Sequence, residues 1–362
     1  MALDFAARPH PNMRPDSELA AVFAAPGFGR HFTDHMAVAT WRKEGGWDDA
    51  ALVPYGPFQL DPAGAVLHYG QEIFEGLKAY RHADGSIWLF RPEANANRLN
   101  ASAVRLGLPE LPVEDFLASI ASLVSADQRW VPDGSDEMSL YLRPFMFAAE
   151  DFLGVRPAET VQYAVIASPV GPYFSGGVKP VDIWVTTTYS RAGFGGTGAA
   201  KCGGNYASSL VAQAEAYDHG CSQVLFTDAA THTWLEELGG MNIFLVSRDD
   251  RLVTPPTSGT ILAGITRDSI LTAAPSLGLV PEVRPVALAE LVEGIATGEY
   301  VEAFACGTAA VLTPIGSFHR EGLEPLRLSH PQGDHTMAIR SRILDIQYGR
   351  TADPYGWRVR VV

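Results

Sequence analysis

The chain carries little positive charge. It has 27 lysine and arginine residues against 41 aspartate and glutamate residues, a formal net charge of −14, and its only lysines are Lys43, Lys78, Lys179 and Lys201. Nucleic acids and anionic membrane surfaces are bound through basic patches, so this balance argues against both as partners. A small anionic ligand would have to be held by individual arginines, by backbone N–H groups or by a lysine.

Cysteines and long apolar runs are also scarce. The three cysteines, Cys202, Cys221 and Cys306, form no CxxC pair and have no metal-ligand spacing, so we expect a reducing compartment and no metal site. The first residues lack the apolar segment of a signal peptide, and no apolar run has the length of a membrane span. These features predict a cytoplasmic protein.

The length and composition are those of a globular protein with a large core. Hydrophobic residues make up 47% of the 362 residues and charged residues 19%, and this length suffices for two domains. The stretch 171–180, GPYFSGGVKP, is dense in glycine and proline and is the best candidate for a connection. We predict a smaller N-terminal domain at residues 1–172, a linker at 173–182 and a larger C-terminal domain at 183–362.

Predicted strands and helices are interspersed along the chain, which is typical of α/β proteins with mixed sheets. Residues 65–80 are interpreted as a strand that leads through Gly70 to a second strand after Gly76. Helices are predicted at 113–126 and 267–274, and strands at 139–147, 161–168, 181–188, 223–227, 242–247 and 301–306. A further helix after residue 206 is expected to bury the face formed by Ala207, Leu210, Val211, Ala214 and Tyr217.

Lys201 lies between two glycine-dense segments. The glycines before it are Gly193, Gly195, Gly196 and Gly198, and those after it are Gly203 and Gly204. Because glycine lets the backbone approach a ligand closely, a lysine here could hold a phosphate or form a Schiff base with an aldehyde. A flexible loop with a solvated lysine is the alternative.

Other patterns could bind a phosphate or a carboxylate. The turn after Gly264 offers the N–H groups of Ile265 and Thr266 together with the Thr266 hydroxyl, and Gly307-Thr308 offers a second hydroxyl. Arg91, Arg98 and Arg105 share a helical face because they are spaced by seven, and one of them turned inward could bind a phosphate. Three solvated arginines are the alternative.

Two strand patterns place charged residues beside possible pocket walls. Tyr141 and Arg143 point to the same face of a strand, so the arginine is either at the rim of a pocket or a carboxylate binder. The adjacent Glu236 and Glu237 cannot both face one side of a strand. A buried one would keep a pyridine nitrogen protonated, whereas an exposed hairpin would leave both in water.

Several segments, in order along nearly the whole chain, resemble the branched-chain amino acid aminotransferases. These segments are FTDHM, LHYGQEIFEGLKAY, FRPEANANRLNASAVRLGLP, LYLRP, VGPYFSGG, KCGGNY, EELGGMNIF, GITR and CGTAAVLTP. The family consists of pyridoxal 5′-phosphate (PLP) enzymes of fold type IV. The resemblance implies a two-domain homodimer with PLP between the domains. It also implies reversible amino transfer from L-leucine, L-isoleucine or L-valine to 2-oxoglutarate.

The resemblance also implies roles for individual residues. Lys201 would form the Schiff base, Tyr206 would contact the cofactor phenolate and Glu237 the ring nitrogen. The phosphate would be held by Arg98, Ile265, Thr266 and Thr308. The substrate pocket would be lined by Phe28, Tyr69, Phe74, Tyr141 and Tyr173, with Ala309 and Ala310 near the substrate carboxylate and Arg143 receiving the side-chain carboxylate of 2-oxoglutarate. Gly240 stands where some relatives have threonine, and Ala310 and Thr313 occupy the positions of a CxxC pair found in others.

Other functions are compatible with parts of the pattern. A D-amino acid aminotransferase or an aminodeoxychorismate lyase would use the same fold and cofactor, although the uncharged aromatic lining favours branched aliphatic substrates. A nucleotide-binding oxidoreductase would use GFGGTGAAKCGG as its dinucleotide loop. That function requires an acidic residue about 20 positions further on, at a strand end. The predicted amphipathic helix occupies this interval, with Asp218 at its end.

Overall fold

The computed structural model describes residues 2–172 and 177–362. The chain divides into two compact units. The first consists of Met1–Tyr173, Ala200–Gly203 and Asp345–Val362, and the second of Phe174–Ala199 and Gly204–Leu344. The units differ from the predicted domains in two respects. The first unit contains more residues than the second, and it includes Lys201, which the predicted boundaries place in the C-terminal domain.

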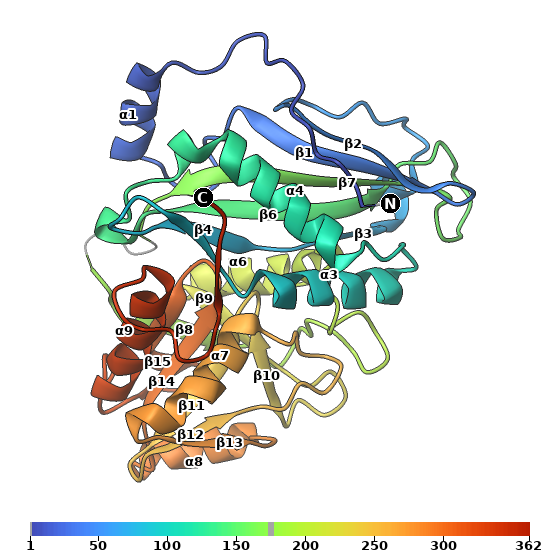
Figure 1. The fold of residues 1–362 in the computed structure, drawn as a ribbon. Coiled ribbons are helices and arrows are strands. Elements are labelled where there is room, and N and C mark those ends of the chain that lie inside the picture. The colour runs from blue at the N-terminus through green and yellow to red at the C-terminus, as the bar shows by residue number, and fades with distance from the viewer. Residues whose placement is uncertain (1, 173–176) are drawn as a thin grey trace. The chain divides into compact units, whose positions relative to one another are not determined.

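The first unit is built on a sheet with the strand order β17-β5-β4-β6-β7-β1-β2, in which β3 pairs with β6 (Figure 1). Its elements are α1 (Asp16–Ala24), β1 (His35–Arg42), β2 (Gly46–Pro54), α2 (Ala65–Tyr69), β3 (Glu72–Phe74), β4 (Leu77–Arg81), β5 (Ile87–Phe90), α3 (Pro92–Leu106), α4 (Val113–Ala126), β6 (Ser139–Ala148), β7 (Thr160–Val170) and β17 (Arg358–Arg360), with 3₁₀ turns at Gln128–Trp130 and Ser135–Glu137.

Helix α4 covers the first sheet. Phe116, Ile120 and Leu123 recur every three or four residues along it and are fully buried in the core of this unit. The helix contacts β1, β7 and α3 (Figure 1). The predicted helix 113–126 is therefore confirmed. The C-terminal residues belong to this unit because β17 pairs with β5, through Val359 opposite Leu89.

The second unit is built on a mixed sheet with the strand order β10-β9-β8-β15-β14-β11-β12-β13, in which β16 pairs with β15. Strand β8 is parallel to both of its neighbours, β9 and β15. The elements are β8 (Val181–Val185), α5 (Gly203–Ala207), α6 (Leu210–Asp218), β9 (Gln223–Thr227), β10 (Leu235–Leu238), β11 (Asn242–Ser247), β12 (Arg251–Thr254), α7 (Ile265–Ala273), a 3₁₀ turn at Ala274–Leu277, β13 (Val280–Val283), α8 (Leu288–Ala296), β14 (Tyr300–Gly307), β15 (Val311–His319), β16 (Leu326–Arg327) and α9 (Asp334–Gln347).

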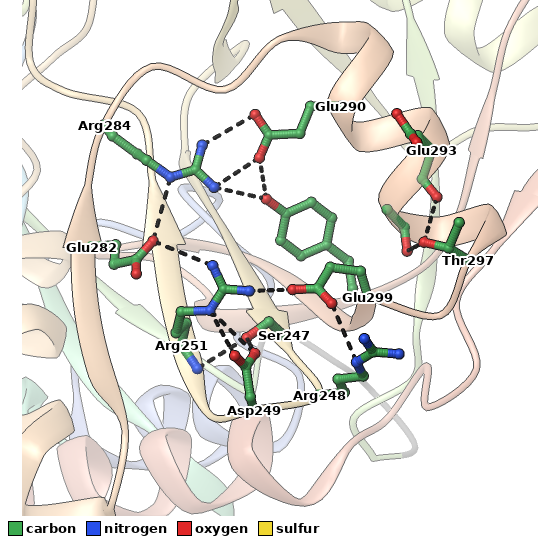
Figure 2. A network of polar contacts seen from close by, with 12 residues as sticks. Ser247, Arg248, Asp249, Arg251, Glu282, Arg284, Glu290, Glu293, Thr297 and Glu299 are labelled. Atoms are coloured by element: carbon green, nitrogen blue, oxygen red, sulfur yellow. Dashed lines mark hydrogen bonds and ion pairs between the residues drawn. The ribbon is translucent and has the colours of Figure 1, made fainter.

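A network of charged side chains joins helix α8 to the strands beside it (Figure 2). Arg284 donates to Glu290 of α8 at 2.7 Å and to the Tyr300 hydroxyl at 3.1 Å, and that hydroxyl donates to Glu290 at 2.5 Å. Burial alone would raise the pKa of Glu290, but the hydrogen bonds from Arg284 and Tyr300 outweigh this effect and lower it. The network therefore favours the ionised carboxylate and holds α8 against β14.

Two local predictions are wrong. Residues 65–69 form helix α2, not a strand, and Gly70 ends it with a left-handed φ of 60°. The face of α6 predicted to be buried is exposed: Leu210, Val211 and Tyr217 are 66%, 60% and 63% exposed. The helix instead buries Ala212 and Ala216, whose small side chains allow it to pack closely on β9.

Within residues 2–172 and 177–362, no helix has the length and apolarity needed to cross a membrane. In the same described part of the chain, no group of three or more histidine, cysteine or acidic side chains could hold a metal ion.

Candidate active site

Lys201 is fixed to the first unit by its own backbone. Its N–H donates to the Ser102 hydroxyl of α3 at 2.9 Å, and its carbonyl accepts from the N–H of Phe74 at 2.9 Å. Its Nζ atom lies 4.7 Å from the centroid of the Phe74 ring, a cation–π distance. Lys201 is thus held on a helix and a strand, which is a more rigid setting than a flexible loop.

A fully buried carboxylate, Glu75, lies beside Lys201. Arg98 binds it through both ends of its guanidinium, at 2.7 and 2.9 Å, and Asn95 donates to it at 2.7 Å. Burial of Lys201 and then the positive charge of Arg98 lower the pKa of the lysine amine to about 8, against the opposing effect of Glu75. A substantial part of the amine is therefore neutral, and able to act as a nucleophile or base, near neutral pH.

Arg98 points inward, so the alternative of three solvated arginines on its helix is wrong. Its guanidinium is the bidentate partner of Glu75, with its side chain 11% exposed. Glu75 is a functional candidate that sequence reasoning missed. The signal was an acidic residue within the otherwise apolar run Ile73 to Leu77.

Four of the predicted pocket residues come together in the first unit. Arg143 stacks on the rings of Phe74 and Tyr141, at 4.7 and 5.3 Å from their centroids, and donates to the Tyr141 hydroxyl at 2.9 Å. The Phe28 ring meets the Tyr141 ring edge-on at 5.1 Å. The Nε atom of Arg143 is buried without a hydrogen-bond partner. This cluster offers apolar ring surface and a charged group capable of binding an anion.

Two other predicted pocket residues are not part of this cluster as described. Tyr69 is 46% exposed and donates its hydroxyl to the Leu153 carbonyl at 2.5 Å. Tyr173 lies outside the described residues.

In the second unit, Glu237 of β10 is the centre of a buried polar network. Glu237 is 3% exposed, forms an ion pair with Arg191, and accepts from the Asn242 amide at 3.0 Å and from the Leu262 N–H at 2.8 Å. The neighbouring Glu236 is also buried, which raises its pKa, and its Oε2 atom has no partner. Neither glutamate is on an exposed hairpin, so that alternative is wrong.

Arg191 links Glu237 to two loops through its guanidinium. The sequence analysis did not single out Arg191. Its guanidinium also donates to the carbonyls of Gly198 and Thr260, at 2.7 and 2.8 Å. The backbone at Thr260 comes so close that a Cβ atom on Gly198 would lie 2.5 Å from it. The glycine at 198 is therefore required by close packing of backbone against backbone.

The predicted phosphate-binding turn lies next to this network. Helix α7 begins at Ile265 after Gly264, no side chain caps its N-terminus, and Thr266 is 8% exposed. A Cβ atom on Gly264 would clash with the side-chain oxygen of Asn242, the residue that binds Glu237. A helix start of this kind presents backbone N–H groups to an anion.

Three more of the predicted site residues form a second turn of this unit. Thr308, Ala309 and Ala310 connect β14 to β15, and a Cβ atom on Gly307 would lie 3.7 Å from the carbonyl oxygen of Gly240. A Cβ atom on Gly240 would in turn lie 3.5 Å from the Tyr206 ring. The second unit therefore brings the Gly240 turn close to both Tyr206 and the 307–310 turn.

Comparison of the sequence and the fold with known proteins identifies the family of the chain. Residues 72–318 match the family described as amino-transferase class IV. A probable branched-chain-amino-acid aminotransferase of Streptomyces coelicolor is 53% identical over 350 residues, covering 97% of this chain and 96% of that protein. The crystal structure of the Escherichia coli branched-chain amino acid aminotransferase is 26% identical, with a TM-score of 0.74 and coverage of 90% and 100%.

A third comparison concerns the cofactor. A branched-chain amino acid aminotransferase from T.th., solved with pyridoxamine 5′-phosphate, is 28% identical with a TM-score of 0.72 and coverage of 90% and 99%. The chain belongs to the class IV aminotransferase family, and the predicted PLP cofactor and mixed α/β fold are confirmed at this level.

The residues present fit this cofactor. Its aldehyde, phosphate and pyridine nitrogen require an amine, an anion site and a carboxylate. Lys201 has a lowered pKa, the start of α7 lacks a side-chain cap, and Glu237 is held by Arg191.

Proposed function

We propose that the chain is a branched-chain amino acid aminotransferase, which moves the amino group of L-leucine, L-isoleucine or L-valine to 2-oxoglutarate. The observation that carries the proposal is the buried Lys201 amine with its pKa of about 8, beside the Glu75–Arg98 pair. The names of the relatives support the choice of substrates.

PLP supplies an aldehyde that holds the amino group and a ring that accepts the electron pair released at the substrate α-carbon. Lys201 would hold the cofactor through its amine and, when that amine is free, would be the base that takes the proton from the substrate α-carbon and returns it to the cofactor. A base with a pKa near the working pH is efficient in this role. Tyr206 would bind the phenolate oxygen of the cofactor.

Glu237 holds the proton of the pyridine nitrogen in this scheme. Arg191 forms an ion pair with its carboxylate and the Asn242 amide donates a hydrogen bond to it inside the protein. The phosphate is assigned to Arg98, Ile265, Thr266 and Thr308. For Arg98 this requires that one guanidinium serve both the phosphate and Glu75.

The aromatic cluster of the first unit explains how one pocket could accept two kinds of substrate. The rings of Phe28, Phe74 and Tyr141 offer apolar surface to a branched aliphatic side chain. Arg143, stacked on two of these rings, would bind the distal carboxylate of 2-oxoglutarate. Ala309 and Ala310 are assigned to the α-carboxylate, with Gly240 nearby.

A homodimer and a cytoplasmic location are part of the proposal. The first unit exposes apolar side chains around the Tyr69–Leu153 hydrogen bond, among them Leu67, Leu153 and Val155 at 58%, 55% and 83%. A second copy of the chain would cover such a patch, and Val155→Glu is expected to shift sedimentation toward the monomer. The three free cysteines support a reducing compartment.

The first experiment is visible absorption of the purified protein before and after addition of L-leucine or D-leucine, followed by borohydride reduction and peptide mapping. We expect a yellow protein that bleaches with the L-isomer only and carries the reduced cofactor on Lys201. A label on another lysine would refute the assignment of Lys201. Equal bleaching by D-leucine would favour a D-amino acid aminotransferase.

A further inference from the structure

An acidic residue, Glu72, lies on the same sheet face as the aromatic cluster of the first unit. Side chains of a strand alternate between its two faces, so Glu72 and Phe74 share one face of β3. Strand β3 pairs with β6 through Phe74 opposite Phe145, and Arg143 precedes Phe145 by two residues. Arg143 therefore points to this face as well, together with Tyr141 two residues before it.

The carboxylate of Glu72 is fixed against the segment that carries Lys201. It accepts a hydrogen bond from the N–H of Gly203, and a Cβ atom on Gly203 would clash with the same carboxylate oxygen. The N–H of Phe74 donates to the Lys201 carbonyl at 2.9 Å, so β3 binds this segment at two points. The glycine at position 203 lets the carboxylate approach the backbone this closely, so its negative charge has a fixed place beside the proposed site.

The charge of Arg143 acts on this carboxylate. Burial raises the pKa of Glu72, while the hydrogen bond from Gly203 and the positive charge of Arg143 oppose the rise. Both side chains are partly buried, so water screens the two charges less than it would at the surface. Arg143 therefore has a negative charge near it within the protein before any substrate binds.

The two kinds of proposed substrate place opposite demands on Arg143. A branched aliphatic side chain that covers the guanidinium takes an unbalanced charge out of water, which is costly. An ionised Glu72 nearby reduces this cost because it balances the charge. The distal carboxylate of 2-oxoglutarate is attracted by Arg143 but repelled by Glu72. A repulsive group of this kind changes one affinity more than the other, and so sets specificity.

We propose that Glu72 is a specificity-determining residue: its carboxylate offsets the charge of Arg143, which favours apolar side chains in the cluster and limits the affinity for dicarboxylates. This role rests on the proposed function, because the cluster is taken as the wall that receives the substrate side chain. Glu72 acts through Arg143 and is not itself a catalytic residue.

The test is calorimetric titration of the holoenzyme in its pyridoxamine form with two ligands that cannot react, glutarate and 4-methylpentanoate. Glutarate is 2-oxoglutarate without its oxo group, and 4-methylpentanoate is the corresponding analogue of the oxo acid formed from leucine. The titrations are run at about pH 8, more than about three pH units above the ordinary pKa of a glutamate, so that the carboxylate is ionised. We expect Glu72→Gln to raise the affinity for glutarate relative to 4-methylpentanoate at least about fivefold.

Two further variants separate charge from packing. The amide of Glu72→Gln can still accept from the N–H of Gly203, whereas Glu72→Leu removes both the charge and the acceptor. Glu72→Leu should therefore show the same change in relative affinity together with slower turnover, because the segment that carries Lys201 loses a hydrogen bond. The matched control, Glu44→Gln, changes an exposed carboxylate of the same unit and should leave the relative affinity unchanged.

Any of four results would overturn the proposal. An unchanged ratio of affinities in Glu72→Gln would show that the ligand does not respond to the charge, and an equal change in both affinities would leave Glu72 only a structural role. Weaker binding of glutarate in Glu72→Gln would mean that Glu72 supports the dicarboxylate. Binding of neither analogue to the wild type would remove the cluster from the substrate site. Turnover of L-leucine with 2-oxoglutarate by the wild type tests the proposed function separately, and its absence would refute that function even where the ratio shifts as expected.

Discussion

The lowered pKa of Lys201 can be measured directly in the cofactor-free protein. A pKa of about 8 means that about a quarter of the amine is neutral at about pH 7.5. An ordinary lysine, with a pKa of 10.5, would be neutral in only about one molecule in a thousand. The rate at which an acylating reagent labels Lys201 should therefore rise with pH around a midpoint near pH 8 and level off at higher pH.

Two substitutions should move this midpoint in opposite directions. The negative charge of Glu75 stabilises the ammonium, so Glu75→Gln should lower the pKa of Lys201 further. The positive charge of Arg98 destabilises the ammonium, so Arg98→Met should raise it. The sign of each shift follows from charge alone, because both groups lie beside the lysine inside the protein.

The assay is mass spectrometric quantification of labelled Lys201 peptide over a series of pH values, with Lys43 in the same digest as the reference for reagent decay. The side chain of Lys43 is 64% exposed, which makes it accessible to the reagent at each pH. A wild-type midpoint near 10 would refute the reasoning about burial. The same midpoint in both variants would refute the role assigned to the Glu75–Arg98 pair.

Three further predictions concern the second unit. Arg191→Met leaves the Glu237 carboxylate buried without its cation, so we expect about 3–5 kcal/mol less stability in urea unfolding, and the double variant with Glu237→Met should recover part of the loss. Gly198→Ala forces a Cβ atom against the Thr260 backbone and should cost about 1–3 kcal/mol, whereas Gly193→Ala in the same loop, with open space around it, should cost less than half as much. The pKa of Glu290 is lowered below 4.5 in the folded protein, so the contribution of its ionised carboxylate to folding stability is present above about pH 4.5 and is lost as the pH falls through the folded pKa. Glu290→Gln should therefore flatten the fall in melting temperature between about pH 6 and 3. The control Glu293→Gln, which changes an exposed carboxylate of the same helix, should not.

The residues that we propose for the chemistry were easier to predict from the sequence than the groups beside them. Lys201 and Glu237 belong to segments with distinctive local composition, and helix α4 has a regular apolar period. Glu75 and Arg191 act on these residues through space. A loop, two helices and a strand lie between Arg191 and Glu237 in the chain, so no periodic pattern in the sequence links the two residues.

The exposed face of α6 illustrates a second limit of prediction from the sequence. A period of 3.6 residues shows which side chains share a face, but it does not show which face packs on the sheet. The larger side chains Leu210, Val211 and Tyr217 suggested the buried side, yet the space above β9 is narrow enough to select Ala212 and Ala216. Packing distance, which is a tertiary property, determined the outcome.

The candidate residues include two buried ion pairs, Glu75–Arg98 and Glu237–Arg191. A buried salt bridge is often no more stabilising than apolar side chains of similar volume, because both charges lose their hydration. Stability alone therefore does not explain why Glu75–Arg98 and Glu237–Arg191 are retained in the interior. Each pair instead lies beside a group of the proposed chemistry: the charges of the first act on the pKa of the Lys201 amine, and the second places a cation on the Glu237 carboxylate. Replacing either pair by well-packed apolar residues should therefore restore part of the stability lost when one partner is removed, while abolishing the control of charge that the proposed chemistry requires.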